Sequence, residues 1–283
     1  MKRFLNFTLP DFVRLLARRI FYLPVDAFDS ITGRRPEGVP PRRKILVSYD
    51  EYLNEGEKYL TYFQELGDLQ PDHSMLEAGC GTGRMALPLT HFLNKKGEYY
   101  GFDDAKGDIN WCKKNISEKH PNFHFQYTGS ENRTSGTSTI ADATHLVFPY
   151  ENAQFDFVFL SSVLTYLKPA EVENHINEIG RVMKPGAISL MTFFIVNCLS
   201  EDLMIKKPTQ MHFPFNKGFY RLRSLEADKK QIAYDEEWIL EKLQKAGLKM
   251  VSIQYGSWCG RPHFFDFPDM IICSKEQKKN PDF

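Results

Sequence analysis

Residues 76–84, Leu-Glu-Ala-Gly-Cys-Gly-Thr-Gly-Arg, decide the expected fold of this chain. They continue an apolar run over 74–78 and lead into a helical pattern over 84–95. Glycines at alternate positions let the backbone pass against a ligand without a Cβ in the way. The N-terminus of the helix beyond them offers unpaired N–H groups. The stretch therefore predicts a strand, a ligand-binding turn and a helix.

Strand and helix patterns alternate outward from this turn. The expected helices are 55–66, 84–95, 109–119, 170–183 and one that Asp235 caps and Gly247 ends. The expected strands are 74–78, 98–102, 123–127, 155–160, 188–196, 249–255 and 270–273. Such alternation predicts an α/β fold with a doubly wound, mostly parallel seven-stranded sheet. A basic and aromatic insert over 198–233 interrupts the alternation before the last helix.

The composition excludes several classes of protein. The 283 residues are 42% hydrophobic and 25% charged, as in ordinary globular proteins. Lys and Arg (36) balance Asp and Glu (36), so no overall field favours nucleic acid or an anionic membrane. The longest uncharged run, 185–200, is shorter than the roughly 18–20 apolar residues of a membrane-spanning helix. Five scattered cysteines predict neither a disulfide framework nor a metal site. With no pattern of a cleaved secretory signal, the expected location is the cytoplasm.

The N-terminal segment departs from this balance. Residues 1–44 contain ten basic and four acidic side chains, a net charge of +6. We expect residues 1–45 to form a basic, helical extension, and residues 46–283 to form the main domain. The favoured interpretation is a helix packed against that domain with its arginines in water. The alternative is peripheral contact of residues 1–30 with an anionic membrane surface.

The residues around the turn discriminate between two ligands. Dinucleotide-binding enzymes use Gly-x-Gly-x-x-Gly, but Arg84 stands where the third glycine would fall. Glu77 would repel a pyrophosphate and attract an ammonium group. Asp103, twenty residues after Gly83, can accept hydrogen bonds from a ribose diol. A nucleoside with a cationic amino-acid tail, S-adenosylmethionine, fits this set better than NAD.

Several motifs in sequence order resemble those of the class I S-adenosylmethionine-dependent methyltransferases. They are the turn 77–83, Asp103, Phe148-Pro149-Tyr150 ahead of the run 155–158, and Arg181 with Lys184-Pro185-Gly186. The resemblance covers residues 70–200 well and 235–275 loosely, and it implies the Rossmann-like fold of that family. Together with the turn it implies a cofactor site made of Glu77, Gly79, Cys80, Gly81, Gly83, Asp103, Asp104, Asp142, Ala143 and Ser161.

The chain departs from the family pattern at two places. Many members carry an adenine-reading acid directly after the third strand, where this chain has Gly129-Ser130-Glu131. Asp142, in an Ala-Asp-Ala segment, is favoured over Glu131 for this role, although it lies two residues too far from Phe148 for a simple match. Many members also have a histidine after the fourth strand, where this chain has Tyr166.

Transfer of a methyl group to oxygen or nitrogen requires an aligned acceptor and, for a protonated acceptor, a general base. The candidates are Tyr166, His145 and His212, whereas His175 is expected on a solvated helix surface.

The insert 198–233 and the loop 129–147 are expected to cover the acceptor, with aromatic side chains or with Arg221 and Arg223. Because Leu160-Ser161-Ser162-Val163 replaces the Asn/Asp-Pro-Pro-Tyr of many base-modifying relatives, we expect a small-molecule, saccharide or lipid-linked acceptor and no nucleic acid. The alternatives are a nicotinamide-dependent oxidoreductase and a binding module without turnover.

Overall fold

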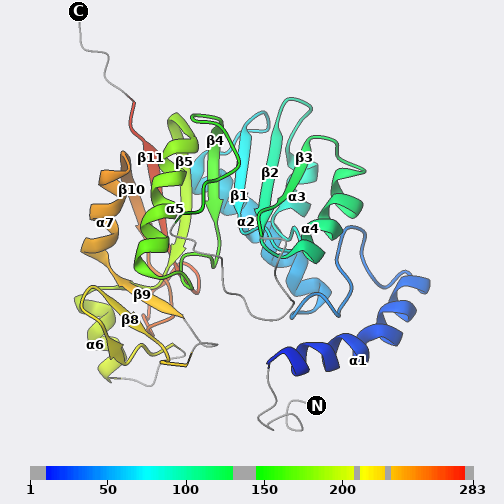
Figure 1. Cartoon of the computed structure of the whole chain (residues 1–283), viewed down its shortest axis with the longest axis horizontal. Coiled ribbons are helices and arrows are strands. Elements are labelled where there is room, and N and C mark those ends of the chain that lie inside the picture. The colour runs from blue at the N-terminus through cyan, green and yellow to red at the C-terminus, as the bar shows by residue number, and fades with distance from the viewer. Residues whose placement is uncertain (1–10, 130–144, 207–210, 227–230, 278–283) are drawn as a thin grey trace, which may run out of the picture. The chain divides into compact units, whose positions relative to one another are not determined.

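The computed structural model of the protein describes residues 11–129, 145–206, 211–226 and 231–277 (Figure 1). They divide into two compact units. The first contains the described parts of Met1–Thr61, Cys80–Phe92 and Phe102–Ala141. The second contains those of Tyr62–Gly79, Leu93–Gly101 and Asp142–Phe283.

A seven-stranded sheet with the order β10-β11-β5-β4-β1-β2-β3 is the main element of the fold. Its strands are β1 (Ser74–Ala78), β2 (Glu98–Asp103), β3 (Phe123–Tyr127), β4 (Phe155–Leu160), β5 (Met183–Phe193), β10 (Leu248–Gln254) and β11 (Asp269–Lys275). β4 pairs in parallel with β1 and β5, whereas β11 pairs antiparallel with β5 and β10. The mostly parallel α/β sheet expected from the sequence is confirmed.

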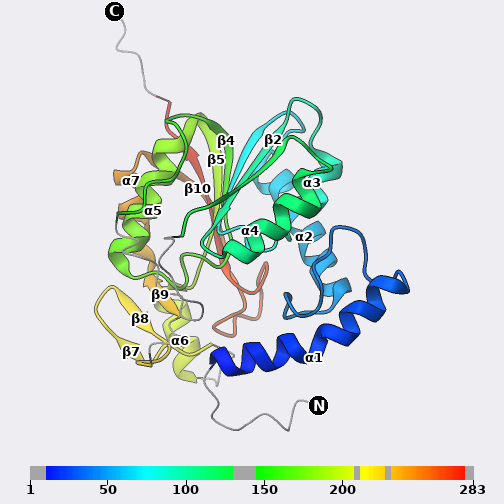
Figure 2. The same cartoon turned by 45° about the vertical axis from the view of Figure 1, so that its right-hand side comes forward.

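The second unit is built around β4. Five of its six residues are buried, as a strand covered on both faces requires. Phe63, from the part of α2 (Tyr49–Gly67) that belongs to this unit, packs edge-on against Phe157 and Phe159 at 5.3 and 4.6 Å. α5 (Pro169–Val182) and α7 (Glu236–Lys245) lie side by side on the sheet (Figures 1 and 2). Asp235 stands at the N-cap of α7, but its carboxylate makes no capping hydrogen bond, so the predicted side-chain cap is wrong.

The predicted strand 188–196 is in fact two strands in two sheets. β5 begins at Met183, directly after α5, and ends at Phe193. After Phe194 the chain enters β6 (Ile195–Val196), the edge of a four-stranded sheet with β7 (Phe215–Asn216), β8 (Tyr220–Leu222) and β9 (Ile232–Asp235). With α6 (Cys198–Lys206), this sheet makes up the described part of the insert. The insert therefore has a fold of its own.

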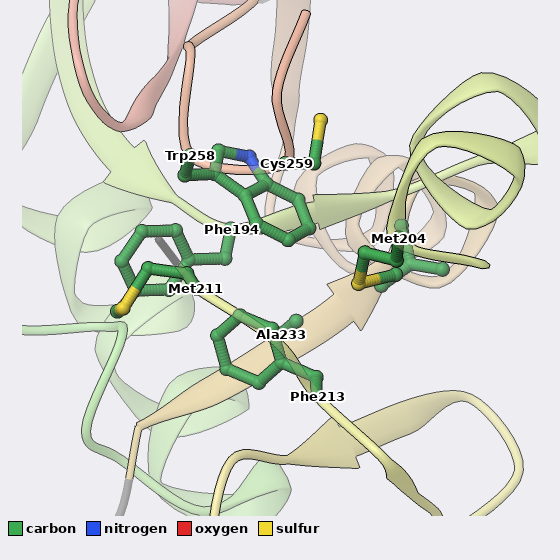
Figure 3. Close-up of a cluster of buried hydrophobic side chains, with 8 residues drawn as sticks. Phe194, Met204, Met211, Phe213, Ala233, Trp258 and Cys259 are labelled. Carbon is green, nitrogen blue, oxygen red and sulfur yellow. The ribbon is translucent and has the colours of Figure 1, made fainter. Parts of the chain in front are cut away.

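The insert has its own apolar core, drawn in Figure 3. The rings of Phe194, Phe213 and Trp258 have centroids 5.4–5.5 Å apart. Met204 and Met211 complete the cluster with Val196, Ala233 and Cys259. Phe213, one of the aromatic residues of the insert that were expected to cover the acceptor, is buried here. Its role is to hold the insert together.

A buried carboxylate joins the two sheets. Asp269, the first residue of β11, is fully buried. Its Oδ2 accepts hydrogen bonds from the backbone N–H of Ile195 in β6 and from Nε1 of Trp258, both at 2.6 Å. Its Oδ1 accepts from the N–H of Gly256 at 2.7 Å and from Nη1 of Arg261 at 3.0 Å. The insert is thus anchored to the main sheet by a buried carboxylate that accepts four hydrogen bonds, one of them from Arg261.

The first unit contains the N-terminal helix and the elements around β3. They are α1 (Asp11–Ile31), the first part of α2, α3 (Ala86–Phe92), α4 (Lys106–Cys112) and a short π-helix, η1 (Lys113–Ser117). α1 continues through Pro24 and ends before the proline-rich segment 36–41. Asp26 and Asp29 are buried, Val13 and Val25 are half-buried, and six large apolar side chains of the helix are exposed. Among the arginines of the helix, Arg19 is exposed and Arg18 is half-buried, so the expectation of arginines in water holds for Arg19, but the helix packs on its unit through buried aspartates. Among the described residues, no helix has the length and hydropathy needed to cross a membrane.

Candidate cofactor-binding site

The glycine turn Cys80–Gly83 is fixed from several sides within the first unit. The N–H of Cys80 donates to the carbonyl of Phe102 at 3.1 Å, and the N–H of Gly81 donates to Oδ2 of Asp103 at 2.9 Å. The hydroxyl of Tyr52, in α2, donates to the carbonyl of Thr82 at 3.0 Å. The turn is therefore pre-organised against the end of β2. α3 begins only at Ala86, three residues after the turn.

Gly81 and Gly83 are required for different reasons. Both have positive φ, +51° and +77°. A Cβ on Gly83 would lie 2.7 Å from Cδ1 of Ile116 and 3.1 Å from Sγ of Cys112, so this glycine permits close packing of the turn on the following helices. A Cβ on Gly81 would meet no described atom within 4 Å. Gly81 thus presents bare backbone to open space, as a cradle for a ligand requires.

Alanine at these two positions should separate ligand binding from folding. Gly81→Ala should weaken binding of S-adenosylhomocysteine about tenfold by filling that space, at a conformational cost of about 1–2 kcal/mol. Gly83→Ala should chiefly lower the free energy of unfolding, by about 2–4 kcal/mol, because it adds a packing conflict to the same conformational cost. Calorimetric titration and thermal denaturation measure the two effects. Equal loss of stability in both variants would contradict the assignment of Gly81 to the ligand.

Asp103 is held by the backbone on both sides of its carboxylate. Oδ1 accepts from the N–H of Ala105 at 2.8 Å, and Oδ2 accepts from that of Gly81. Desolvation raises the pKa of this carboxyl, and the two N–H donors oppose that shift. Each oxygen retains lone pairs for a further donor. Asp103 is thus suited to accept hydrogen bonds from a ribose diol. Asp104 beside it is half-buried.

Glu77 and Gly79 belong to the second unit. Glu77 is 3% exposed, and one carboxylate oxygen accepts a hydrogen bond from the hydroxyl of Tyr99 at 2.5 Å. Gly79 has a φ of +82°, and a Cβ there would lie 2.4 Å from Cγ2 of Val163. The segment after β4 therefore packs directly on this glycine.

The chain after β4 is strained where it passes this position. Ser161 is half-buried. Ser162 has a φ of +59°, a backbone conformation that is unfavourable for residues other than glycine. The N–H of Ser162 donates to Oγ1 of Thr192 in β5 at 2.8 Å, which holds the bend. Such strain at the carboxyl end of a central strand is typical of functional segments.

The three candidate bases all belong to the second unit. Tyr166 is 51% exposed, and its hydroxyl accepts a hydrogen bond from Nε2 of Gln231 at 3.1 Å. His145 and His212 are exposed. The structure leaves their assignment as bases a prediction. The remaining candidates, Asp142, Ala143 and Glu131, lie outside the described residues.

His175 is not on the surface, as the sequence suggested. It is 3% exposed, its ring packs edge-on against Phe148 at 5.5 Å, and its Nδ1 lies 2.8 Å from the carbonyl oxygen of Glu171. Burial lowers its pKa. Its position between the buried residues Val172 and Ile179, on one helix face, places it inward despite its polar neighbours.

The arginines that the sequence analysis singled out bond other groups of the protein. Arg221 pairs with Glu201, and Arg223 donates to Gln231, so neither guanidinium of the insert is free of protein partners. Arg181 pairs with Glu178 and donates to the carbonyls of Phe148 and Tyr150. The arginine of the family signature therefore fixes the loop that leads into β4.

Sequence reasoning missed the residues that support the site. Tyr99, Tyr52 and Thr192 each bond a residue at least 22 positions away in the chain. For the tyrosines a signal was present, since a tyrosine on a buried strand or helix face needs a partner for its hydroxyl. The sequence does not say which partner.

Comparison with known proteins identifies the domain. Residues 76–191 match a family described as a methyltransferase domain. The chain is 25% identical over 146 residues to a tRNA N(3)-cytidine methyltransferase METTL2 of Danio rerio, covering 47% of this chain and 38% of that protein. It is 25% identical over 118 residues to a 2-phytyl-1,4-naphtoquinone methyltransferase of Trichormus variabilis, covering 42% and 45%. The chain thus spans less than half the length of these relatives.

Solved structures share the fold. An S-adenosylmethionine-dependent methyltransferase of Mesorhizobium loti superposes with a TM-score of 0.55 at 11% identity, covering 78% of this chain and 99% of that one. The PH0226 protein of Pyrococcus horikoshii gives 0.53 at 14% identity, covering 82% and 93%. Residues 76–191 thus match a methyltransferase domain, the described residues share the fold of S-adenosylmethionine-dependent methyltransferases, and both findings agree with the class I resemblance of the motifs, whose cofactor is S-adenosylmethionine.

Proposed function

We propose that the protein transfers the methyl group of S-adenosylmethionine to an oxygen or nitrogen of a small-molecule, saccharide or lipid-linked acceptor. The observation that carries the proposal is the fixed turn, where Gly81 presents bare backbone and donates to Asp103. Asp103 would hold the ribose hydroxyls. Glu77, four residues ahead of Gly81 in the chain, would hold the ammonium group, and Gly79, Cys80, Gly83, Asp104, Asp142, Ala143 and Ser161 would complete the cofactor site.

The proposed methyl transfer requires no covalent intermediate with the protein. When bound, S-adenosylmethionine supplies an activated methyl group on a sulfonium. The residues of the chain have to align the acceptor in line with that bond, which is worth about 7–11 kcal/mol of the barrier in well-oriented systems. They also have to remove the acceptor's proton. We assign this role to Tyr166, His212 or His145, of which Tyr166 follows β4 most closely.

The acceptor class is argued from the charges of the insert. Arg221 and Arg223 are engaged with Glu201 and Gln231, and Lys206 pairs with Asp202. Among the described residues of the insert, the charges of Arg221 and Lys206 are thus neutralised by carboxylates, which weakens their attraction for a nucleic acid backbone. This supports a small or glycan-like acceptor over RNA. Because one relative is a tRNA methyltransferase, tRNA belongs among the acceptors tested.

Calorimetric titration with S-adenosylhomocysteine is the first test, and micromolar binding is expected. Release of S-adenosylhomocysteine from S-adenosylmethionine is then measured with phenols, amines, saccharides, quinols and tRNA. Turnover with tRNA alone would overturn the acceptor class. Binding without turnover on any acceptor would favour a binding module. A fluorescence titration in which NADH binds and S-adenosylhomocysteine does not would favour an oxidoreductase.

A further inference from the structure

The amphipathic helix α1 is attached to its unit by its charged face. Asp26 accepts from the N–H of Arg42 at 2.6 Å and from Nη1 of Arg43 at 3.2 Å. Asp29 accepts from Nε of Arg42 at 2.8 Å and from the hydroxyl of Tyr49 at 3.1 Å. Both aspartates are buried. These contacts fix which side of the helix faces the protein.

The opposite face of α1 is apolar and exposed. Large side chains recur on it at spacings of one to five residues, and each is 51–85% exposed: Leu16, Ile20, Phe21, Leu23, Phe28 and Ile31. Ala17, Pro24 and Ala27 lie between them and are also exposed. We call these nine residues the apolar strip. A helix on a globular domain normally turns such a face to the core. Over residues 16–31 of α1, which is dark blue in Figure 2, six large apolar side chains are instead exposed, and the buried side chains are those of Asp26 and Asp29.

Cationic side chains border the apolar strip. Arg19 and Arg34 are exposed, and the guanidinium of Arg34 lies 5.0 Å from the centroid of the Phe28 ring. The sequence of this segment carries a net +6 over residues 1–44. An apolar helix face with arginines at its edges matches the interface of a bilayer that contains anionic lipids.

A second copy of the chain is a poorer match for this face. A helix of 21 residues presents about 30 Å of length and about 10 Å of width, or about 300 Å². Stable protein dimers bury about 800 Å² on each partner. A bilayer needs no matching protein surface, because lipid chains cover an isolated helix face of any shape.

We propose that α1 docks the protein onto the surface of membranes that contain anionic lipids. The apolar strip lies at the boundary between headgroups and acyl chains, and Arg19 and Arg34 contact lipid phosphates. The buried Asp26 and Asp29 keep the charged face on the protein, so the helix lies along the membrane plane. This inference goes beyond the proposed methyl transfer and does not depend on it.

The test is co-sedimentation of the full chain with vesicles of phosphatidylcholine containing 30% phosphatidylglycerol. The wild type should bind these vesicles, and should bind pure phosphatidylcholine or vesicles in 1 M NaCl much less. Ile20→Asp/Leu23→Asp should lower the partition coefficient about tenfold or more, since two apolar side chains leave the lipid. The matched control is Leu199→Asp/Ile205→Asp, which makes the same change at exposed positions of α6 and should bind as the wild type does.

Other outcomes would overturn the proposal. They are no binding of the wild type, equal loss in both double variants, or no loss in Ile20→Asp/Leu23→Asp. A dimer in sedimentation equilibrium that this variant dissociates, without vesicle binding, would assign the strip to a second copy. Thermal denaturation confirms folding, and the substituted side chains are exposed, so little change is expected. Retained binding of S-adenosylhomocysteine by the variant separates docking from the cofactor site.

Discussion

Asp103→Ala is expected to reduce the affinity for S-adenosylhomocysteine by about a hundredfold or more. The carboxylate is fixed by the N–H groups of Gly81 and Ala105, so its remaining lone pairs point in set directions. Two ribose hydroxyls would each donate to a charged acceptor, and such hydrogen bonds contribute about 1.5–3 kcal/mol each. Their combined loss gives the expected factor, measured by isothermal titration.

The matched control is Asp104→Ala, which removes the same charge one position along the chain. This side chain is half-buried, and its loss should change the affinity several-fold at most. Asp103→Asn keeps the shape of the side chain, and its affinity for S-adenosylhomocysteine should lie between those of Asp103→Ala and Asp104→Ala. Circular dichroism separates loss of binding from loss of fold, because Asp103 also supports the turn. Equal affinities for Asp103→Ala and the wild type would refute the ribose assignment.

The same carboxyl predicts how binding depends on pH. Desolvation raises the pKa of Asp103 above the ordinary 3.8. The side chain therefore takes up a proton at a higher pH than a solvated aspartate does. Affinity for S-adenosylhomocysteine should be constant at neutral pH and decrease on acidification, beginning above the pH at which free aspartate titrates. This decrease should be smaller in Asp103→Asn, titrated over the same range.

Asp269→Ala is expected to lower the free energy of unfolding by about 3–5 kcal/mol. The substitution leaves Arg261, 5% exposed, without its anionic partner, and it removes the acceptor of Trp258, Gly256 and Ile195. An uncompensated buried charge accounts for most of the loss. Chemical denaturation followed by far-UV circular dichroism measures it.

An exposed ion pair provides the control for this prediction. Asp202→Ala removes the partner of Lys206 on α6, where both side chains are more than 60% exposed. Solvent screens this pair, so the loss should be no more than about 0.5 kcal/mol. A similar loss in both variants would show that the Asp269 network does not join the two sheets as described.

Elements with strong local signals could be predicted from the sequence. The strand 155–160 is apolar at five of its six residues, and it forms β4 with the same bounds. The glycine turn and Asp103 follow from residue type and spacing, and the structure brings Gly81 and Asp103 into hydrogen-bond contact. Both features depend on a few neighbouring residues, where propensity and pattern agree.

Features that depend on distant contacts could not be predicted. The run 188–196 is uniformly strand-like, and only pairing with β9 shows that the chain changes sheets after Phe193. His175 has polar neighbours in sequence, yet the position of Phe148 and the helix period bury it. α1 has an ordinary amphipathic pattern. The exposure of its large apolar side chains accompanies two buried aspartates that bond residues 13 to 20 positions away.

The single residue between β5 and β6 restricts how this protein can be re-engineered. Because Phe194 alone joins the two strands and its ring packs in the core of the insert, grafting foreign chain at 195–235 would leave Phe194 and Trp258 facing mismatched neighbours. A viable chimera has to exchange the aromatic cluster together with the segment 256–269. Recombination points for exchanging the insert among relatives therefore belong before β5 and after β11.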